Sequence, residues 1–82
     1  MFKTYSDNEI NIIVNLAKNI ILNCNSIEEI LTRFNKDIIP HISILFPICE
    51  FGTFGEYTFY THGFINHERC SRRCIKECVI EY

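Results

Sequence analysis

Three regularly spaced cysteines near the end of the chain have the most conspicuous chemistry. Cys70, Cys74 and Cys78 are four residues apart, so in a helix they would lie on one face. Thiolates bind zinc tetrahedrally, and His67, Cys70 and Cys74 form the best local trio of candidate ligands. The spacing lacks a paired C-x2-C signature, however, and buried cysteines commonly act as small hydrophobic residues. We therefore favour a buried cysteine face over a small zinc-binding module, and expect no cofactor.

Basic residues occupy the opposite side of the same predicted helix. This basic stripe consists of Arg69, Arg72, Arg73 and Lys76, which recur at helical spacing. A stripe of cations suits an acidic protein surface or nucleic-acid phosphates. Tyr60, on the polar face of a neighbouring predicted strand, could add an aromatic contact. An ordinary solvated face is the alternative interpretation, because acidic residues flank the stripe.

The sequence contains no arrangement of residues typical of an enzyme active site. It has no Gly-rich phosphate loop, nucleophile elbow or paired-carboxylate motif. His62 or His67 could pair with a cysteine, but nothing in the spacing fixes their distance. A chain of 82 residues also has little room for both a substrate pocket and a core. We predict that the protein is not an enzyme.

Length and composition indicate one small globular domain covering residues 1–82. The chain is 48% hydrophobic and 22% charged, which is typical of globular proteins. Its net charge of −2 argues against a general nucleic-acid binder, which would usually be basic. Five cysteines, an odd number, suit free thiols in the cytoplasm better than a secreted disulfide framework.

Targeting and membrane signals are not visible in the sequence. Met1 is followed directly by a polar stretch without an apolar signal region, and the longest apolar runs are far shorter than a membrane span. We expect a cytoplasmic protein that does not contact membranes. Fifteen isoleucines and eight asparagines are typical of AT-rich genomes, so we expect a phage, viral or low-GC microbial protein (in the host cytoplasm if phage or viral).

The first half of the chain predicts two helices. The first runs from Asp7 to Asn23 after the N-cap residue Ser6, and Glu9 completes a capping box. The second begins after Ser26 and ends before Pro40. Because the connection is short, the two helices should form an αα-hairpin.

The first helix has an apolar face broader than a surface helix needs. Ile12 and Leu16 widen the stripe of apolar residues at helical spacing. We favour a helix that packs against two neighbours in the core. The alternative is that part of this face meets another chain, which would make a homodimer through the first helix.

The middle of the chain predicts a β-hairpin. Residues 41–51 are rich in β-branched and aromatic side chains and predict a buried strand. Pro47 requires that this strand be bulged, short or at an edge. Residues 52–55 predict a turn, and residues 56–62 the second strand. Two strands alone are marginal in water, so the helices should cover one face of them.

The end of the chain predicts a third helix. Gly63 should break the second strand, and Asn66 should cap a helix from His67 to about Ile80. The expected fold class is therefore α+β: an αα-hairpin, then a β-hairpin, then a C-terminal helix (α-α-β-β-α), in a single small domain.

The function predicted from the sequence is that of a small intracellular binding protein. It should act stoichiometrically as an inhibitor, adaptor or regulator of a macromolecular partner. The expected partner is a protein with an acidic surface, contacted by the basic stripe and Tyr60. Nucleic-acid binding by the same stripe and a small zinc module remain the alternatives.

Overall fold

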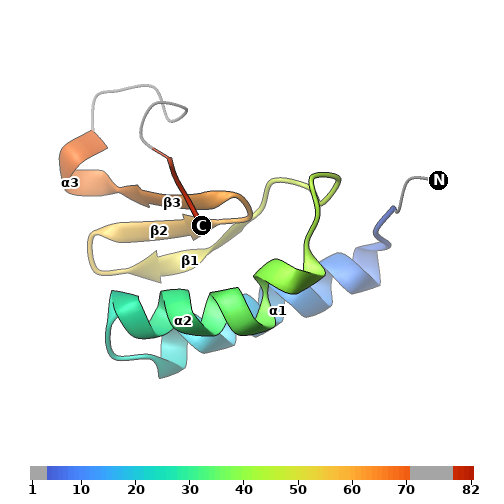
Figure 1. The fold of residues 1–82 in the computed structure, drawn as a ribbon, viewed down its shortest axis with the longest axis horizontal. Helices are drawn as coiled ribbons and strands as arrows, with labels where there is room; N and C mark the ends of the chain where they lie inside the picture. The colour runs from blue at the N-terminus through green and yellow to red at the C-terminus, as the bar shows by residue number, and fades with distance from the viewer. Residues whose placement is uncertain (1–3, 71–78) are drawn as a thin grey trace.

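Two helices cover one face of a four-stranded antiparallel sheet in the computed structural model, which describes residues 4–70 and 79–82 (Figure 1). The elements in order are α1 (Asp7–Asn23), α2 (Ile27–Asp37), the 3-10 helix η1 (Ile39–His41), β1 (Glu50–Phe54), β2 (Tyr57–Tyr60), β3 (Gly63–Asn66), α3 (His67–Cys70) and β4 (Ile80–Glu81). The α+β class and the helical hairpin are confirmed. Within the described ranges, every helix is too short or too polar to cross a bilayer.

Both long helices begin where their capping residues predict. The Ser6 hydroxyl accepts a hydrogen bond from the Glu9 N–H at 3.2 Å, and the Glu9 carboxylate accepts one from the Ser6 N–H at 3.2 Å. The Ser26 hydroxyl likewise accepts from the Glu29 N–H at 3.2 Å. These bonds satisfy backbone donors that the first helical turn leaves without partners. The predicted caps are confirmed.

The core lies between the helices and the sheet, with Phe34 of α2 at its centre. Phe34 is fully buried. Its ring makes edge contacts with three others, at centroid distances of 5.8 Å to Phe51, 5.5 Å to Phe59 and 5.8 Å to Tyr82. Aromatic rings favour this edge-to-face geometry. One side chain of α2 therefore joins β1, β2 and the residue that follows β4.

Helix α1 packs against both α2 and β1, as its broad apolar face predicts. Ala17, Ile20 and Ile21 are buried there. Ile12 and Leu16, the residues that widen the apolar stripe, remain exposed. The packing against two neighbours is confirmed, and the homodimer through this helix stays a prediction.

The strand predicted over residues 41–51 is wrong for most of its length. His41 ends η1, residues 42–49 form a loop, and β1 begins only at Glu50. Pro47 lies within this loop and has no N–H to donate to a neighbouring strand. The predicted turn also moves, because β1 continues to Phe54 and the chain reverses at Gly55 and Glu56.

The turn between β1 and β2 depends on a left-handed glycine. Gly55 has a φ of 58° at the first position of the two-residue connection. Two-residue hairpin turns of the primed types require a positive φ there, which glycine adopts without steric cost. The hairpin itself is confirmed, with Phe54 opposite Tyr57.

The predicted C-terminal helix is wrong at its end, and the sheet has two more strands than predicted. Gly63 starts β3 instead of ending the sheet, and Ile80 lies in β4. Residues 71–78 of the predicted helix lie outside the described residues. The start of α3 at His67 is confirmed, because the Asn66 side chain accepts a hydrogen bond from the Glu68 N–H at 3.0 Å.

The close approach of β4 explains why glycine lies within the sheet at this position. Gly63 pairs with Glu81, and Phe64 pairs with Ile80. A side chain on Gly63 would overlap the carbonyl oxygen of Ile80. Glycine is therefore needed here because another strand passes directly beside it, a long-range contact that a single-sequence pattern does not show.

Two carboxyl groups approach each other where the β1–β2 turn meets α3. The His67 N–H donates to the Glu56 carbonyl at 2.8 Å, and the Glu56 and Glu68 side chains share a hydrogen bond. A hydrogen bond to Glu56, followed by its like charge, raises the pKa of Glu68 above its ordinary value. The protonated form of Glu68 is thus favoured by folding.

Stability should therefore fall as pH rises through the range in which Glu68 ionises. Its contribution is fully present below the ordinary glutamate pKa of about 4.3 and is lost above the raised pKa of the folded state. Glu56→Gln should consequently raise the melting temperature at pH 7 and change it much less at pH 4. Thermal unfolding across this range tests the prediction, with Glu28→Gln on the exposed side of α2 as the control. An equal effect at both pH values would contradict it.

Candidate functional site

Residues 42–49, hereafter the apolar loop, present large apolar side chains to solvent. The exposed fractions are 90% for Ile44, 46% for Leu45 and 78% for Ile48. Single exposed apolar side chains are common on protein surfaces, whereas a cluster of them marks an interaction site. Three such residues within five positions make this loop the leading candidate for partner binding.

The first anchor of the apolar loop is Phe46, which points inward and is almost fully buried. Its ring packs edge-on against Tyr5, at a centroid distance of 4.8 Å. The Tyr5 hydroxyl lies 3.3 Å from the His41 carbonyl oxygen and 3.2 Å from the Ser43 hydroxyl. The Phe46 N–H donates to the Ser43 carbonyl at 2.9 Å and closes a turn. The segment before α1 therefore fixes the first half of the loop.

The second anchor is Thr61, a buried residue in the turn between β2 and β3. Its hydroxyl accepts from the Cys49 N–H at 2.8 Å and donates to the Pro47 carbonyl at 3.0 Å. Its own N–H donates to the Cys49 carbonyl at 3.0 Å. The apolar loop is thus bound at both ends, and its exposed side chains project from a preorganised backbone.

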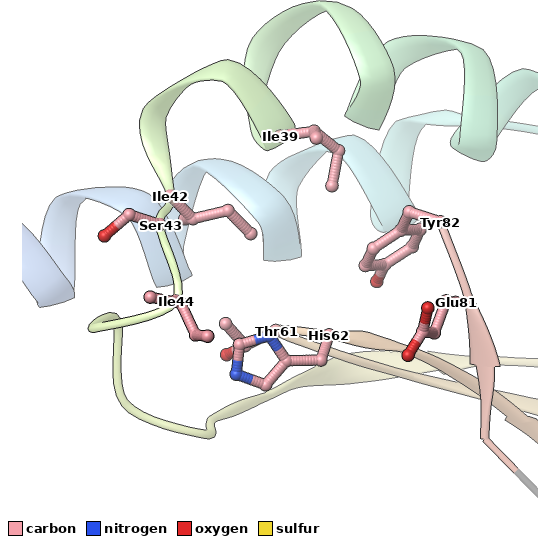
Figure 2. Close-up of a pocket in the computed structure, with 8 residues that line it drawn as sticks. All are labelled: Ile39, Ile42, Ser43, Ile44, Thr61, His62, Glu81 and Tyr82. Atoms are coloured by element: carbon pink, nitrogen blue, oxygen red, sulfur yellow. The ribbon is translucent and has the colours of Figure 1, made fainter.

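An open pocket of about 530 Å³ lies between the apolar loop and the sheet (Figure 2). It is lined by Ile39, Ile42, Ser43, Ile44, Thr61, His62, Glu81 and Tyr82. In Figure 2 the isoleucines form the upper and left walls, while His62 and Glu81 extend from the sheet below and to the right. The pocket therefore joins an apolar wall to a polar one.

The hydroxyl groups that line this pocket already have partners within the protein. Ser43 is close to Tyr5 and accepts from the Leu45 N–H, and Thr61 holds the end of the apolar loop. The Tyr82 hydroxyl donates to the Tyr60 carbonyl at 2.6 Å, and burial raises the Tyr82 pKa above its ordinary value. His62 and Glu81 are the remaining polar side chains that face the pocket. Such a pocket is suited to binding through these two groups.

A smaller pocket of about 170 Å³ lies beside Tyr5. It is lined by Tyr5, Glu9, Ile12, Ile13 and His41. The contact between Tyr5 and Ser43 connects it to the larger pocket, which Ser43 also lines. Exposed Ile12 of α1 therefore lines a second recess, which it shares with Tyr5, one of the residues that hold the apolar loop.

The partner-binding residues predicted from the sequence are only partly within the described residues. Tyr60 belongs to β2 and is half-buried, with its carbonyl bonded to Tyr82. Arg69 belongs to α3. Arg72, Arg73 and Lys76 lie outside the described residues, so the basic stripe stays a prediction.

The predicted zinc ligands are also not assembled in the described residues. His67 shares a hydrogen bond between its Nε2 and the Thr58 hydroxyl. Cys70 ends α3, and Cys74 lies outside the described residues. Within residues 4–70 and 79–82, no three His, Cys, Asp or Glu side chains gather as metal ligands. The zinc module also stays a prediction.

The sequence offered one signal of the apolar loop, which is Pro47. A proline within a predicted central strand argues against that strand. If the segment is not a strand, its isoleucines are not buried in a sheet and can be exposed. The pocket gave no comparable signal, because its lining residues come from three separate parts of the chain. No family model, curated protein or solved structure matched this chain. Function is therefore inferred from the surface itself.

Proposed function

We propose that this protein is a small binding protein that acts stoichiometrically on a protein partner, as an inhibitor, adaptor or regulator. Its main contact would be the apolar loop, through Ile44, Leu45 and Ile48. The observation that carries the proposal is that these side chains are exposed while the loop backbone is fixed at Phe46 and Thr61.

The energetics of binding favour this interpretation. Burying an exposed isoleucine or leucine side chain contributes about 1.5–3 kcal/mol. A flexible loop would lose part of that gain as conformational entropy, but the anchored backbone is already ordered. Protein interfaces have apolar centres with polar edges, and the apolar loop next to His62 and Glu81 offers both.

Two further observations support the proposed class and location. The hydroxyl groups around the pocket are engaged in internal hydrogen bonds, which favours a binding protein over an enzyme. Cys24 and Cys49 are free thiols, as expected for the reducing cytoplasm. We also propose that the basic stripe provides a second contact, to an acidic region of the same partner.

Removing the exposed isoleucines should strongly weaken partner binding without unfolding the protein. The variant Ile44→Ser/Ile48→Ser should capture its partner from host extract at least about tenfold less efficiently, since each lost contact is worth more than 1 kcal/mol. Quantitative affinity capture with mass spectrometry measures this loss.

The matched control is Leu22→Ser, because Leu22 is 80% exposed but belongs to α1, away from the apolar loop. It should retain the partner, and both variants should keep the wild-type melting temperature within a few degrees. Equal capture by the loop variant and the control would rule out the apolar loop as the contact.

A further inference from the structure

We infer that the pocket in Figure 2 receives an arginine or lysine side chain from the partner protein. This inference rests on the proposed function and specifies its partner. The pocket combines a carboxylate with an apolar wall, and a long cationic side chain matches both features.

The charge of the pocket comes from Glu81. Glu81 is the lining residue whose side chain carries a carboxylate. Among the described residues, no lysine or arginine lines the pocket. The described ion pair is the one between Arg33 and Asp37 on α2, at 3.6 Å. Among the described residues, Glu81 therefore offers a negative charge with no lysine or arginine beside it in the pocket.

The apolar wall suits the stem of such a side chain. Ile42 and Ile44 line the side of the pocket opposite Glu81, and Ile39 lines its upper wall (Figure 2). Lysine and arginine bury their methylene groups against apolar surface while their charged ends remain at polar groups. A partner segment lying on the exposed Ile44 could thus extend its side chain across the isoleucines to the carboxylate.

The position of Glu81 is fixed by its strand. Glu81 pairs with Gly63 in the sheet, and the next residue, Tyr82, packs its ring against Phe34 and Phe64. The Tyr82 hydroxyl is also bonded to Tyr60. The backbone that carries the carboxylate is therefore held on both sides, which favours a defined ligand position.

Other side chains match the pocket less well. An acidic side chain would meet the like charge of Glu81. A purely apolar side chain would remove water from the carboxylate without offering it a counter-charge. Desolvating an unpaired ion in this way costs free energy. A cation restores that balance, so it is the occupant that the described residues favour.

The test uses two small probes that differ in charge. N-acetyl-arginine methylamide and N-acetyl-norleucine methylamide are titrated separately into the whole protein, and the NMR signals of Ile42, Ile44 and His62 are followed. The arginine probe should shift these signals and bind more tightly than the neutral probe. Glu81→Gln should weaken arginine binding about two- to fivefold, as expected for a partly exposed charge pair.

The matched control is Glu28→Gln, which removes an exposed carboxylate from α2 and should leave arginine binding unchanged. Unchanged spectra elsewhere in each variant show that the fold is intact. Equal binding of the two probes, no binding of either, or an unaltered affinity in Glu81→Gln would overturn the inference. The proposed function has a separate readout, because partner capture through Ile44 and Ile48 does not depend on the probes.

Discussion

Replacing Phe34 with alanine should lower the free energy of unfolding by about 3–5 kcal/mol. Phe34 is fully buried and contacts three aromatic rings, from β1, β2 and the residue after β4. Its removal takes away the transfer free energy of the ring and leaves a cavity that these rigid neighbours fill poorly. Urea denaturation followed by circular dichroism measures the loss.

Folded domains have free energies of unfolding of about 5–15 kcal/mol, and small domains lie near the lower end of this range. Phe34→Ala should therefore be partly unfolded at 37 °C. Phe34→Leu retains most of the apolar volume and should cost clearly less, which keeps the effect measurable. Leu22→Ala, at an exposed position on α1, is the control. A loss below about 1 kcal/mol for Phe34→Ala would contradict the central place of this ring in the core.

Gly63→Ala should displace β4 and destabilise the protein by about 1–3 kcal/mol or more, as expected for overpacking. The new Cβ would overlap the Ile80 carbonyl oxygen and lie 2.8 Å from the Val79 Cγ1. Because backbone atoms cannot rotate away as a side-chain end can, the strand itself must move. Tyr82 should then lose its hydrogen bond to Tyr60.

The measurements are urea denaturation and the NMR signals of the Tyr82 ring. Gly55→Ala is the matched control, because a Cβ there has no neighbour within 4 Å but the φ of 58° is unfavourable for alanine. It should cost about 1–2 kcal/mol through backbone conformation alone and leave the Tyr82 signals in place. If the Tyr82 ring signals are unchanged in Gly63→Ala, the position of β4 does not require a glycine at position 63.

The Gly63 variant also connects the fold to the candidate site. Glu81 and Tyr82 line the pocket, and both depend on the pairing between β3 and β4. We therefore expect Gly63→Ala to weaken binding of the arginine probe as well. Leu22→Ala should not, since it lies outside this pocket.

The sequence by itself determined the two long helices and one strand. Ser6 with Glu9, and Ser26 with Glu29, are capping pairs whose partners lie three residues apart, so a local pattern is enough to identify them. The apolar spacing of α1 also predicted that this helix packs against two neighbours. Strand β2 lies within the strand predicted over residues 56–62, although the turn before it is at Gly55 and Glu56.

The apolar loop, the last two strands and the pocket are evident only from the tertiary structure. A strand exists through its neighbours, and the neighbour of Gly63 is Glu81, eighteen positions later in the chain. The isoleucines on both sides of Pro47 fit a strand pattern equally well, but the contacts with Tyr5 and Thr61 make this segment a loop. Pairing and packing between distant segments carry no local signature. For that reason the sequence predicted a contact through the basic stripe, whereas the apolar loop and the position of Glu81 are evident only from the structure.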